Sequence, residues 1–391
     1  MLRRILSQMW KALAALLLSI WLVLATTTPA LAGQDVYKTL QARAYPGSQN
    51  REYIVHLPTN YNGSQPVPLV MVLHGCKQTH ETIKHDTDFD SLADQEGFAA
   101  VYPFITSYNG WRNPNCWGFW FDEHIHEGGG EVQDLRSIIE EVQRDYKIDP
   151  NRIHITGLSS GAGMTVAALV AHSELFASGS PTAGLPYSET ASSVGFSCSN
   201  PGTFKSVAQV AAAMKSELDR DPPQEKAKRV VPILAIHSAD DCTVNVKASE
   251  NIRDSFLQLW KQGFGVDFST LKVTEESGVT KGTPWTLKKY AVEPGSRTIA
   301  ETLFLKGLPH GWYGNRDGQY AFSKAPNTAQ LVWDFFKSHP FNTNQPPTVT
   351  IDRVTADQQG LSLSVEGTAT DPDGSVASVK VEWRARSPQD P

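Results

Sequence analysis

The sequence predicts an α/β fold, in which a mostly parallel sheet carries helices on both faces. Short apolar runs typical of buried strands alternate with helical segments along most of the 391 residues. One predicted strand, residues 153–156, breaks at a glycine and runs directly into a helix that begins at Ser160. Residues 348–391 differ, because runs of period two predict a short antiparallel β module after the main domain.

Composition restricts the class of protein. Hydrophobic residues make up 40% and charged residues 19% of the chain, which fits a packed globular protein and argues against disorder. The formal net charge is −6 and there is no long basic run, so we expect no nucleic-acid partner. The length allows one large domain with a smaller unit, or two domains.

The first 32 residues have the features of a signal peptide. Arg3, Arg4 and Lys11 supply a positive end, residues 12–25 are almost all apolar, and residues 30–32 form an Ala-Leu-Ala cleavage site. The apolar run is short for a membrane-spanning helix. We therefore expect a secreted protein, extracellular or periplasmic, with no membrane segment after the signal is removed.

Export to an oxidising compartment favours disulfide bonds between the cysteines. The chain has four, which allow three pairings, and the alternative is four buried thiols. They are Cys76, Cys116, Cys198 and Cys242.

Apolar periodicity predicts the elements before the glycine turn. Residues 67–73 form a continuous apolar run, typical of a central strand buried on both faces. Residues 131–146 repeat apolar side chains at i, i+3 and i+4 spacing, which predicts an amphipathic helix, and an aromatic-rich loop, residues 109–130, precedes it. The other elements are two strands within residues 37–61, a short helix near the end of residues 81–96 and a strand at 98–104.

The same alternation continues after the turn. The predicted elements are helices at 160–172, 204–218, 246–262 and 328–337, and strands at 176–182, 226–237, 285–292 and 298–305. The domains expected from this pattern are a signal peptide (1–32), the main domain (33–339), a proline-marked linker (340–347) and the β module (348–391). That module is short for a complete sandwich, so it is partial or truncated.

Residues 157–161 follow the pattern G-x-S-x-G at the break between strand and helix. A serine at such a turn has a strained backbone and needs neighbours without Cβ. The turn presents the Ser159 hydroxyl above the sheet edge, together with free N–H groups at the start of the helix. The alternative is an inert serine in a tight turn, but three nearby glycines favour a nucleophile.

A serine hydroxyl becomes nucleophilic when a base takes its proton and a carboxylate orients that base. On this scaffold the acid and then the base should follow Ser159, each in a loop at the carboxyl end of a strand. His310 is the one histidine of eleven that meets both conditions; the alternative is an ordinary surface histidine. Asp240 and Asp241 both qualify as the acid, and spacing does not choose between them.

Two backbone donors are needed to stabilise the oxyanion that forms on the substrate. One should be the N–H of Ser160. The other should come from the turn after the central strand, residues 74–76. The His74 side chain itself is expected to hold this turn by hydrogen bonds.

Six segments together resemble the polyhydroxybutyrate depolymerase family of secreted esterases, which includes feruloyl and acetylxylan esterases. The segments are Leu-His-Gly-Cys-Lys-Gln (73–78), Cys-Trp-Gly-Phe-Trp-Phe (116–121), Ile-Asp-Pro-Asn-Arg-Ile (148–153), Gly-Leu-Ser-Ser-Gly (157–161), His-Ser-Ala-Asp-Asp-Cys-Thr-Val-Asn (237–245) and His-Gly-Trp (310–312). They span most of the mature chain and are jointly specific. Residues 348–391 resemble part of an Ig-like or cadherin-like module.

The resemblance implies an α/β-hydrolase fold and assigns roles within it. Ser159 would be the nucleophile, His310 the base and Asp241, rather than Asp240, the acid. Cys76 would lend its N–H to the oxyanion hole beside Ser160. The resemblance also implies that Cys76 pairs with Cys116, which leaves Cys198 for Cys242.

These features predict a secreted serine esterase that acts through an acyl-enzyme. Short-chain polyhydroxyalkanoate is the first substrate expected, and feruloylated or acetylated plant polysaccharide is the alternative. A non-catalytic polymer-binding protein is the alternative of another class. We expect a monomer with no cofactor or metal ion. Substrate-binding side chains are predicted at Trp312, Trp117 and Trp120, although core packing is an equal alternative for the last two.

Overall fold

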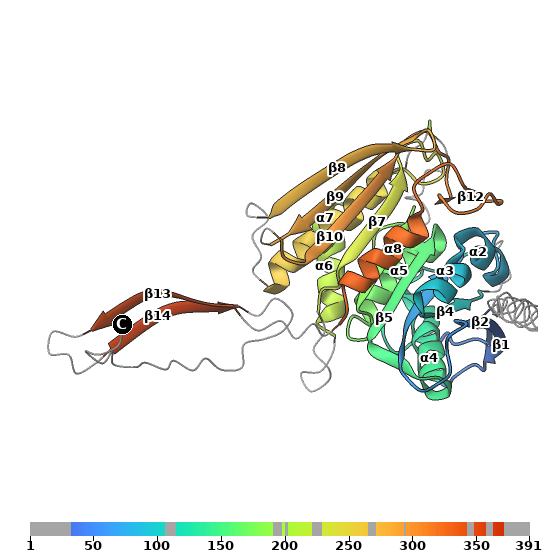
Figure 1. The fold of residues 1–391 in the computed structure, drawn as a ribbon, viewed down its shortest axis with the longest axis horizontal. Helices are drawn as coiled ribbons and strands as arrows, with labels where there is room; N and C mark the ends of the chain where they lie inside the picture. Colours follow the sequence, from blue (N-terminus) through green and yellow to red (C-terminus); the bar gives the residue numbers. More distant parts are fainter. Residues whose placement is uncertain are drawn as a thin grey trace, which may run out of the picture.

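The computed structural model describes residues 33–105, 115–190, 198–199, 202–220, 229–264, 271–292, 295–341, 348–356 and 363–370. Its centre is a sheet with the strand order β1-β2-β4-β3-β5-β6-β7-β10-β9-β8 (Figure 1). The strands from β4 to β10 run parallel, and antiparallel strands complete both edges. The structure confirms the mostly parallel sheet expected from the sequence.

The bounds of the strands agree with the predicted runs in most of the main domain. They are β1 (Gln34–Leu40), β2 (Arg51–Leu57), β3 (Val67–Leu73), β4 (Ala99–Pro103), β5 (Ile148–Leu158), β6 (Ser178–Thr182), β7 (Ile233–Ser238), β8 (Lys272–Thr280), β9 (Thr283–Ala291) and β10 (Thr298–Leu305). A small second sheet pairs β11 (Trp312–Tyr313) with β12 (Ala321–Phe322).

Helices cover both faces of the sheet, and each face has its own apolar core (Figure 1). One core contains Ile138, Met164 and Phe256, from three of the helices on that face. The other contains Phe89 and Trp333. The first face carries α4 (Gly130–Asp145), α5 (Ser160–Ala171), α6 (Val207–Leu218) and α7 (Lys247–Phe264), and the second carries α2 (His80–Thr87), α3 (Phe89–Glu96) and α8 (Thr328–Ser338).

β8 was not predicted from the sequence. It is the last strand in the sheet order and pairs with β9 alone among the described strands. Seven of its nine residues are exposed, including Val273 and Val279. Because side chains on both faces of β8 are exposed, its sequence lacks the alternation of apolar and polar residues that marks a half-buried strand.

Beyond the main sheet, β13 (Thr348–Ala356) and β14 (Leu363–Thr370) form a separate antiparallel sheet, in agreement with the expected C-terminal β module. The predicted signal peptide and residues 371–391 lie outside the described part of the chain. The domain boundaries therefore remain predictions. Within the described residues, no helix combines the length and the apolar character that crossing a membrane requires.

Several histidines are buried in the main sheet and the turns after it, among them His74 and His154. His74 is fully buried; its Nδ1–H donates to Gly75 O at 2.8 Å, and its Nε2 accepts the N–H of Ile105 at 3.2 Å. His154, on β5, is also buried and bonds the Ser178 hydroxyl at 2.9 Å. Burial disfavours the charged imidazolium, lowering the pKa of His74 to about 4 and that of His154 well below its usual value.

We expect the free energy of unfolding to fall as the pH drops from about 6.5 toward about 4. In this window a histidine of the unfolded chain binds a proton that His74 does not bind when folded, so acid favours unfolding. His74→Gln should reduce the slope of stability against pH by up to about 1.4 kcal/mol per unit. Urea unfolding at a series of pH values measures both slopes. Equal slopes for the two proteins would contradict the prediction.

Candidate active site

Ser159 occupies a strained turn between β5 and α5. Its backbone φ of 57° and ψ of −118° lie in a region that side chains other than glycine rarely adopt. Its N–H donates to Thr182 O at 3.0 Å, so the turn is also tied to the end of β6. The side chain is partly exposed, whereas the following residue, Ser160, is buried. The hydroxyl of Ser159 is therefore presented at the carboxyl edge of the sheet.

Two glycines allow the backbone to pass this closely. A Cβ on Gly161 would lie 2.4 Å from His74 O, and a Cβ on Gly157 would lie 2.6 Å from the Gly161 carbonyl carbon. Neither position therefore has space for a side chain, and only the hydrogen atom of a glycine fits. The G-x-S-x-G spacing follows from this packing of β5 and α5 against the end of β3.

Asp241 and His310 meet at the ends of two adjacent parallel strands, β7 and β10. His310 Nδ1–H donates to Asp241 Oδ2 at 2.6 Å. His237 Nε2 lies 3.1 Å from the same oxygen, and the N–H groups of Thr243 and Val244 donate to Oδ1 at 2.8 and 2.9 Å. Burial alone would raise the pKa of Asp241, but the hydrogen bonds from His237 and His310 outweigh it and lower that pKa. The carboxylate is thus ionised and oriented toward the imidazole.

Asp240 has a different part in the structure. It is exposed, and its Oδ2 accepts the N–H of Gly307 at 2.6 Å. Ser238 makes a second contact of this kind, donating its hydroxyl to Leu308 O at 2.6 Å. Both contacts join the loop after β7 to the loop that carries His310. The aspartate that contacts the imidazole is Asp241. The structure therefore distinguishes the two candidate acids, which sequence spacing could not do.

Ser159 lies at the end of β5, which is separated from β7 by β6 in the sheet order. Among the described residues no hydrogen bond joins the Ser159 hydroxyl to His310. Contacts of this kind are often long without substrate and tighten when it binds. His310 is largely buried, with 9% of its side chain exposed.

The predicted oxyanion donors lie on either side of Ser159. Ser160 is the first residue of α5, where backbone N–H groups have no partner within the helix. On the other side is the turn after β3, where a Cβ on Gly75 would lie 3.3 Å from Ser159 Cβ. Cys76 follows in this turn and is joined to Cys116 by a disulfide bond. The second disulfide joins Cys198 to Cys242, next to Asp241.

The structure corrects the substrate-binding prediction for two tryptophans. Trp312 is fully buried, and its ring packs 5.9 Å from that of Phe89 in the core beneath α3. Trp117 is 1% exposed and packs 5.5 Å from the His74 ring. Both fill the core and are not accessible to a substrate. Trp120 is partly exposed and still fits the prediction.

The structure groups three possible metal ligands that sequence analysis did not bring together. Ligand atoms of Glu127, His172 and Glu174 lie within 4.8 Å of one another. Arg136 Nη1 donates to Glu174 Oε1 at 2.5 Å and lies 3.5 Å from Glu127 Oε1. The guanidinium of Arg136 therefore already supplies these carboxylates with the positive charge that a metal cation would bring. Residues so far apart along the chain give no signal in local spacing.

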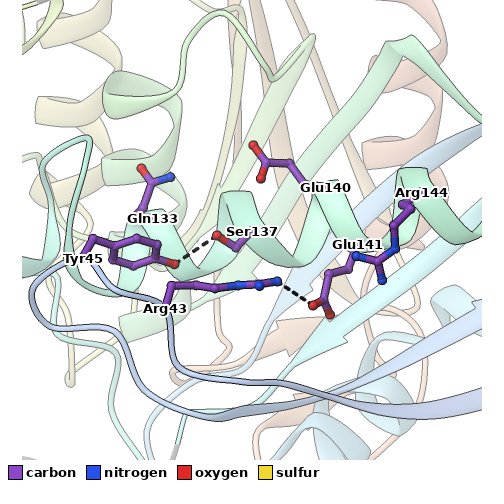
Figure 2. A pocket seen from close by; sticks show the side chains of 7 residues that line it. All are labelled: Arg43, Tyr45, Gln133, Ser137, Glu140, Glu141 and Arg144. Carbon is purple, nitrogen blue, oxygen red and sulfur yellow. Dashed lines mark hydrogen bonds and ion pairs between the residues drawn. The ribbon is translucent and has the colours of Figure 1, made fainter.

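A polar groove of about 550 Å³ lies on the outer side of α4 (Figure 2). Figure 2 shows two interactions within the groove: Arg43 pairs with Glu141, and Tyr45 bonds Ser137. The two distances are 2.7 and 3.0 Å. None of the residues predicted for catalysis lines it.

Comparison with known proteins assigns the chain to a family. Residues 51–271 match the family model described as esterase PHB depolymerase. The chain belongs to this family. The solved structures that resemble it confirm the fold expected from the sequence, that of the α/β-hydrolases.

Relatives of this chain differ in the substrate that their names record. It is 27% identical over 289 residues to poly(3-hydroxyalkanoate) depolymerase C of Paucimonas lemoignei, a match covering 72% of this chain and 64% of the relative. It is 29% identical over 188 residues to acetylxylan esterase A of Emericella nidulans, covering 45% and 59%. The chain thus spans less than two thirds of either relative. The solved acetyl xylan esterase of Aspergillus awamori superposes with a TM-score of 0.54 at 17% identity, covering 78% of this chain and 99% of that one.

The backbone strain at Ser159 should lower the free energy of unfolding, and two variants can measure this effect. Ser159→Ala keeps a Cβ in the unfavourable backbone conformation, whereas Ser159→Gly removes it. We expect the glycine variant to be more stable than the alanine variant by about 1 kcal/mol, after allowing for the greater unfolded-state entropy of glycine. Urea unfolding of both inactive variants measures the difference. An alanine variant of equal or greater stability would show that the turn is not strained.

The adjacent aspartates offer a matched pair of variants. Asp241→Asn should lower kcat by about 10³- to 10⁴-fold, because an amide no longer orients and stabilises the imidazolium. Asp240→Asn keeps an oxygen that accepts the Gly307 N–H and should change kcat by no more than a few-fold. Steady-state hydrolysis of a p-nitrophenyl ester measures both values. Similar losses in the two variants would remove the distinction between the aspartates.

Proposed function

We propose that the protein is a secreted serine esterase whose catalytic residues are Ser159, His310 and Asp241. The observation that carries the proposal is the 2.6 Å hydrogen bond between Asp241 and His310 at the sheet edge where Ser159 is presented. The bond engages Nδ1 of the imidazole, so Nε2 is the nitrogen that acts as a base. The strained elbow and the family match both support a nucleophilic role for Ser159.

The chemistry follows from these positions. Ser159 Oγ attacks the ester carbonyl carbon while its proton passes to His310 Nε2. The carbonyl oxygen becomes an oxyanion that accepts hydrogen bonds from the N–H groups of Cys76 and Ser160. The imidazolium, stabilised by Asp241, then protonates the alcohol as the ester C–O bond breaks. Water attacks the acyl-enzyme by the same steps and releases the acid.

The substrate class that we propose is short-chain polyhydroxyalkanoate. A depolymerase relative matches over 72% of this chain, a larger share than the 45% matched by the acetylxylan esterase of Emericella nidulans. The second candidate is acetylated or feruloylated polysaccharide, which is favoured by the superposition on nearly the whole of a solved acetyl xylan esterase.

Secretion is part of the proposal. The predicted signal peptide supports it, and so do the two disulfide bonds, which persist in an oxidising compartment. All four cysteines of the chain take part in these two disulfide bonds.

One comparison of substrates tests the function. Purified protein is given a polyhydroxybutyrate suspension, acetylated xylan and feruloylated polysaccharide, and the soluble products are measured: hydroxybutyrate, acetate and ferulate. We expect hydroxybutyrate to be released fastest, and Ser159→Ala to release none of the three. Faster release of acetate or ferulate would favour the second candidate. A protein that binds the polymer but hydrolyses no ester, or a Ser159→Ala variant that keeps its activity, would overturn the proposal.

A further inference from the structure

Four consecutive residues of the aromatic loop, 115–118, connect the parts of the proposed oxyanion hole; we call them the strap. Asn115 Nδ2 donates to Gln78 O at 3.2 Å. Cys116 is bonded through sulfur to Cys76, with 4.3 Å between their Cα atoms. The N–H of Trp117 donates to the Ser160 hydroxyl at 3.4 Å. The strap therefore contacts both residues whose backbone N–H groups are proposed to hold the oxyanion.

The far end of the strap is held by a buried carboxylate. Gly118 N–H donates to Glu131 Oε2 at 2.7 Å, and Glu131 is fully buried. A hydrogen bond from an N–H to a buried carboxylate is about twice as strong as a neutral one. Neither the family resemblance nor the reaction mechanism gives a role to this glutamate.

The position of Glu131 explains why a carboxylate can be buried there. It is the second residue of α4, a helix of 16 residues whose N-cap, Gly129, offers no side-chain cap. The helix dipole favours negative charge at this end. The N–H of Glu131 itself donates to His124 Nδ1 at 3.3 Å. The backbone of Glu131 is thus held at the helix start, and its carboxylate contacts the strap.

The strap also lies against the helix of the nucleophile. A Cβ on Gly163 of α5 would lie 2.6 Å from the Phe119 ring, so the residue after the strap packs directly on this helix. The Trp117 ring packs 5.5 Å from that of His74, which holds the turn containing Cys76. A displacement of the strap would therefore also displace both oxyanion donors.

We propose that Glu131 is a positioning residue for the oxyanion hole, acting through the strap on Cys76 and Ser160. The inference rests on the proposed function. Oxyanion donors act only if they lie within hydrogen-bond distance of the oxygen in the transition state. Loss of the Glu131 contact should therefore weaken binding of the transition state more than binding of the substrate.

The test compares Glu131→Ala with Glu131→Gln, whose amide oxygen can still accept the Gly118 N–H. For a p-nitrophenyl ester we expect the alanine variant to lose about 10- to 100-fold in kcat, since displaced donors cost less than a deleted one. Its KM should change by about twofold or less, because ground-state binding is retained. The glutamine variant should recover most of kcat. Affinity for a boronic acid inhibitor, whose oxygen occupies the oxyanion hole, should fall with kcat.

Glu301 provides the matched control. It is 7% exposed on β10 and accepts the Thr298 hydroxyl at 2.7 Å, remote from the strap. Glu301→Ala should lower the thermal midpoint without lowering kcat. If Glu131→Ala behaves in the same way, and binds the boronic acid as the unchanged protein does, its role is structural and the inference is overturned. Glu131→Asp keeps the charge on a shorter side chain and provides the same readouts if the alanine variant does not fold.

The outcome separates this inference from the proposed function. An unchanged protein that hydrolyses esters, with an inactive Ser159→Ala variant and a fully active Glu131→Ala variant, contradicts the role of Glu131 alone. An unchanged protein with no esterase activity contradicts both.

Discussion

Close backbone packing at the carboxyl ends of β3 and β5 is the constraint on which the site depends. Gly157 and Gly161 leave space only for hydrogen where α5 passes the end of β3. This contact forces Ser159 into its strained conformation and brings the start of α5 beside the turn that contains Cys76. The nucleophile and the proposed oxyanion donors are therefore positioned by the main sheet, whose central strands are buried on both faces.

The acid and base are positioned by a different means. β7 and β10 are adjacent parallel strands in which Leu305 is paired with Ser238, so the loops that follow them begin side by side. Donors on every side of Asp241 keep its carboxylate charged despite burial. Strand order brings the two loops together, and hydrogen bonds then set the orientation of His310. This division explains why residues distant in sequence can meet with a fixed geometry.

The sequence predicted features that depend on local chemistry. The turn at Ser159 was predictable because glycines are required there, and His310 because chain order and loop type restrict the choice. Burial depends instead on contacts that local sequence does not record. Trp312 was interpreted as a substrate contact because it follows His310 by two residues, yet its side chain enters the core beside Phe89. β8 was missed for the converse reason, since an uncovered edge strand has no apolar face.

The two disulfides relate the site to the compartment in which the protein is proposed to act. Cys76–Cys116 joins the oxyanion turn to the strap, and Cys198–Cys242 anchors the residue next to Asp241. All four cysteines lie outside the strands of the main sheet. Reduction would therefore remove restraints from both halves of the site while leaving the sheet and its cores in place. An oxidising environment thus does more than permit these bonds: it maintains the geometry on which the proposed catalysis depends.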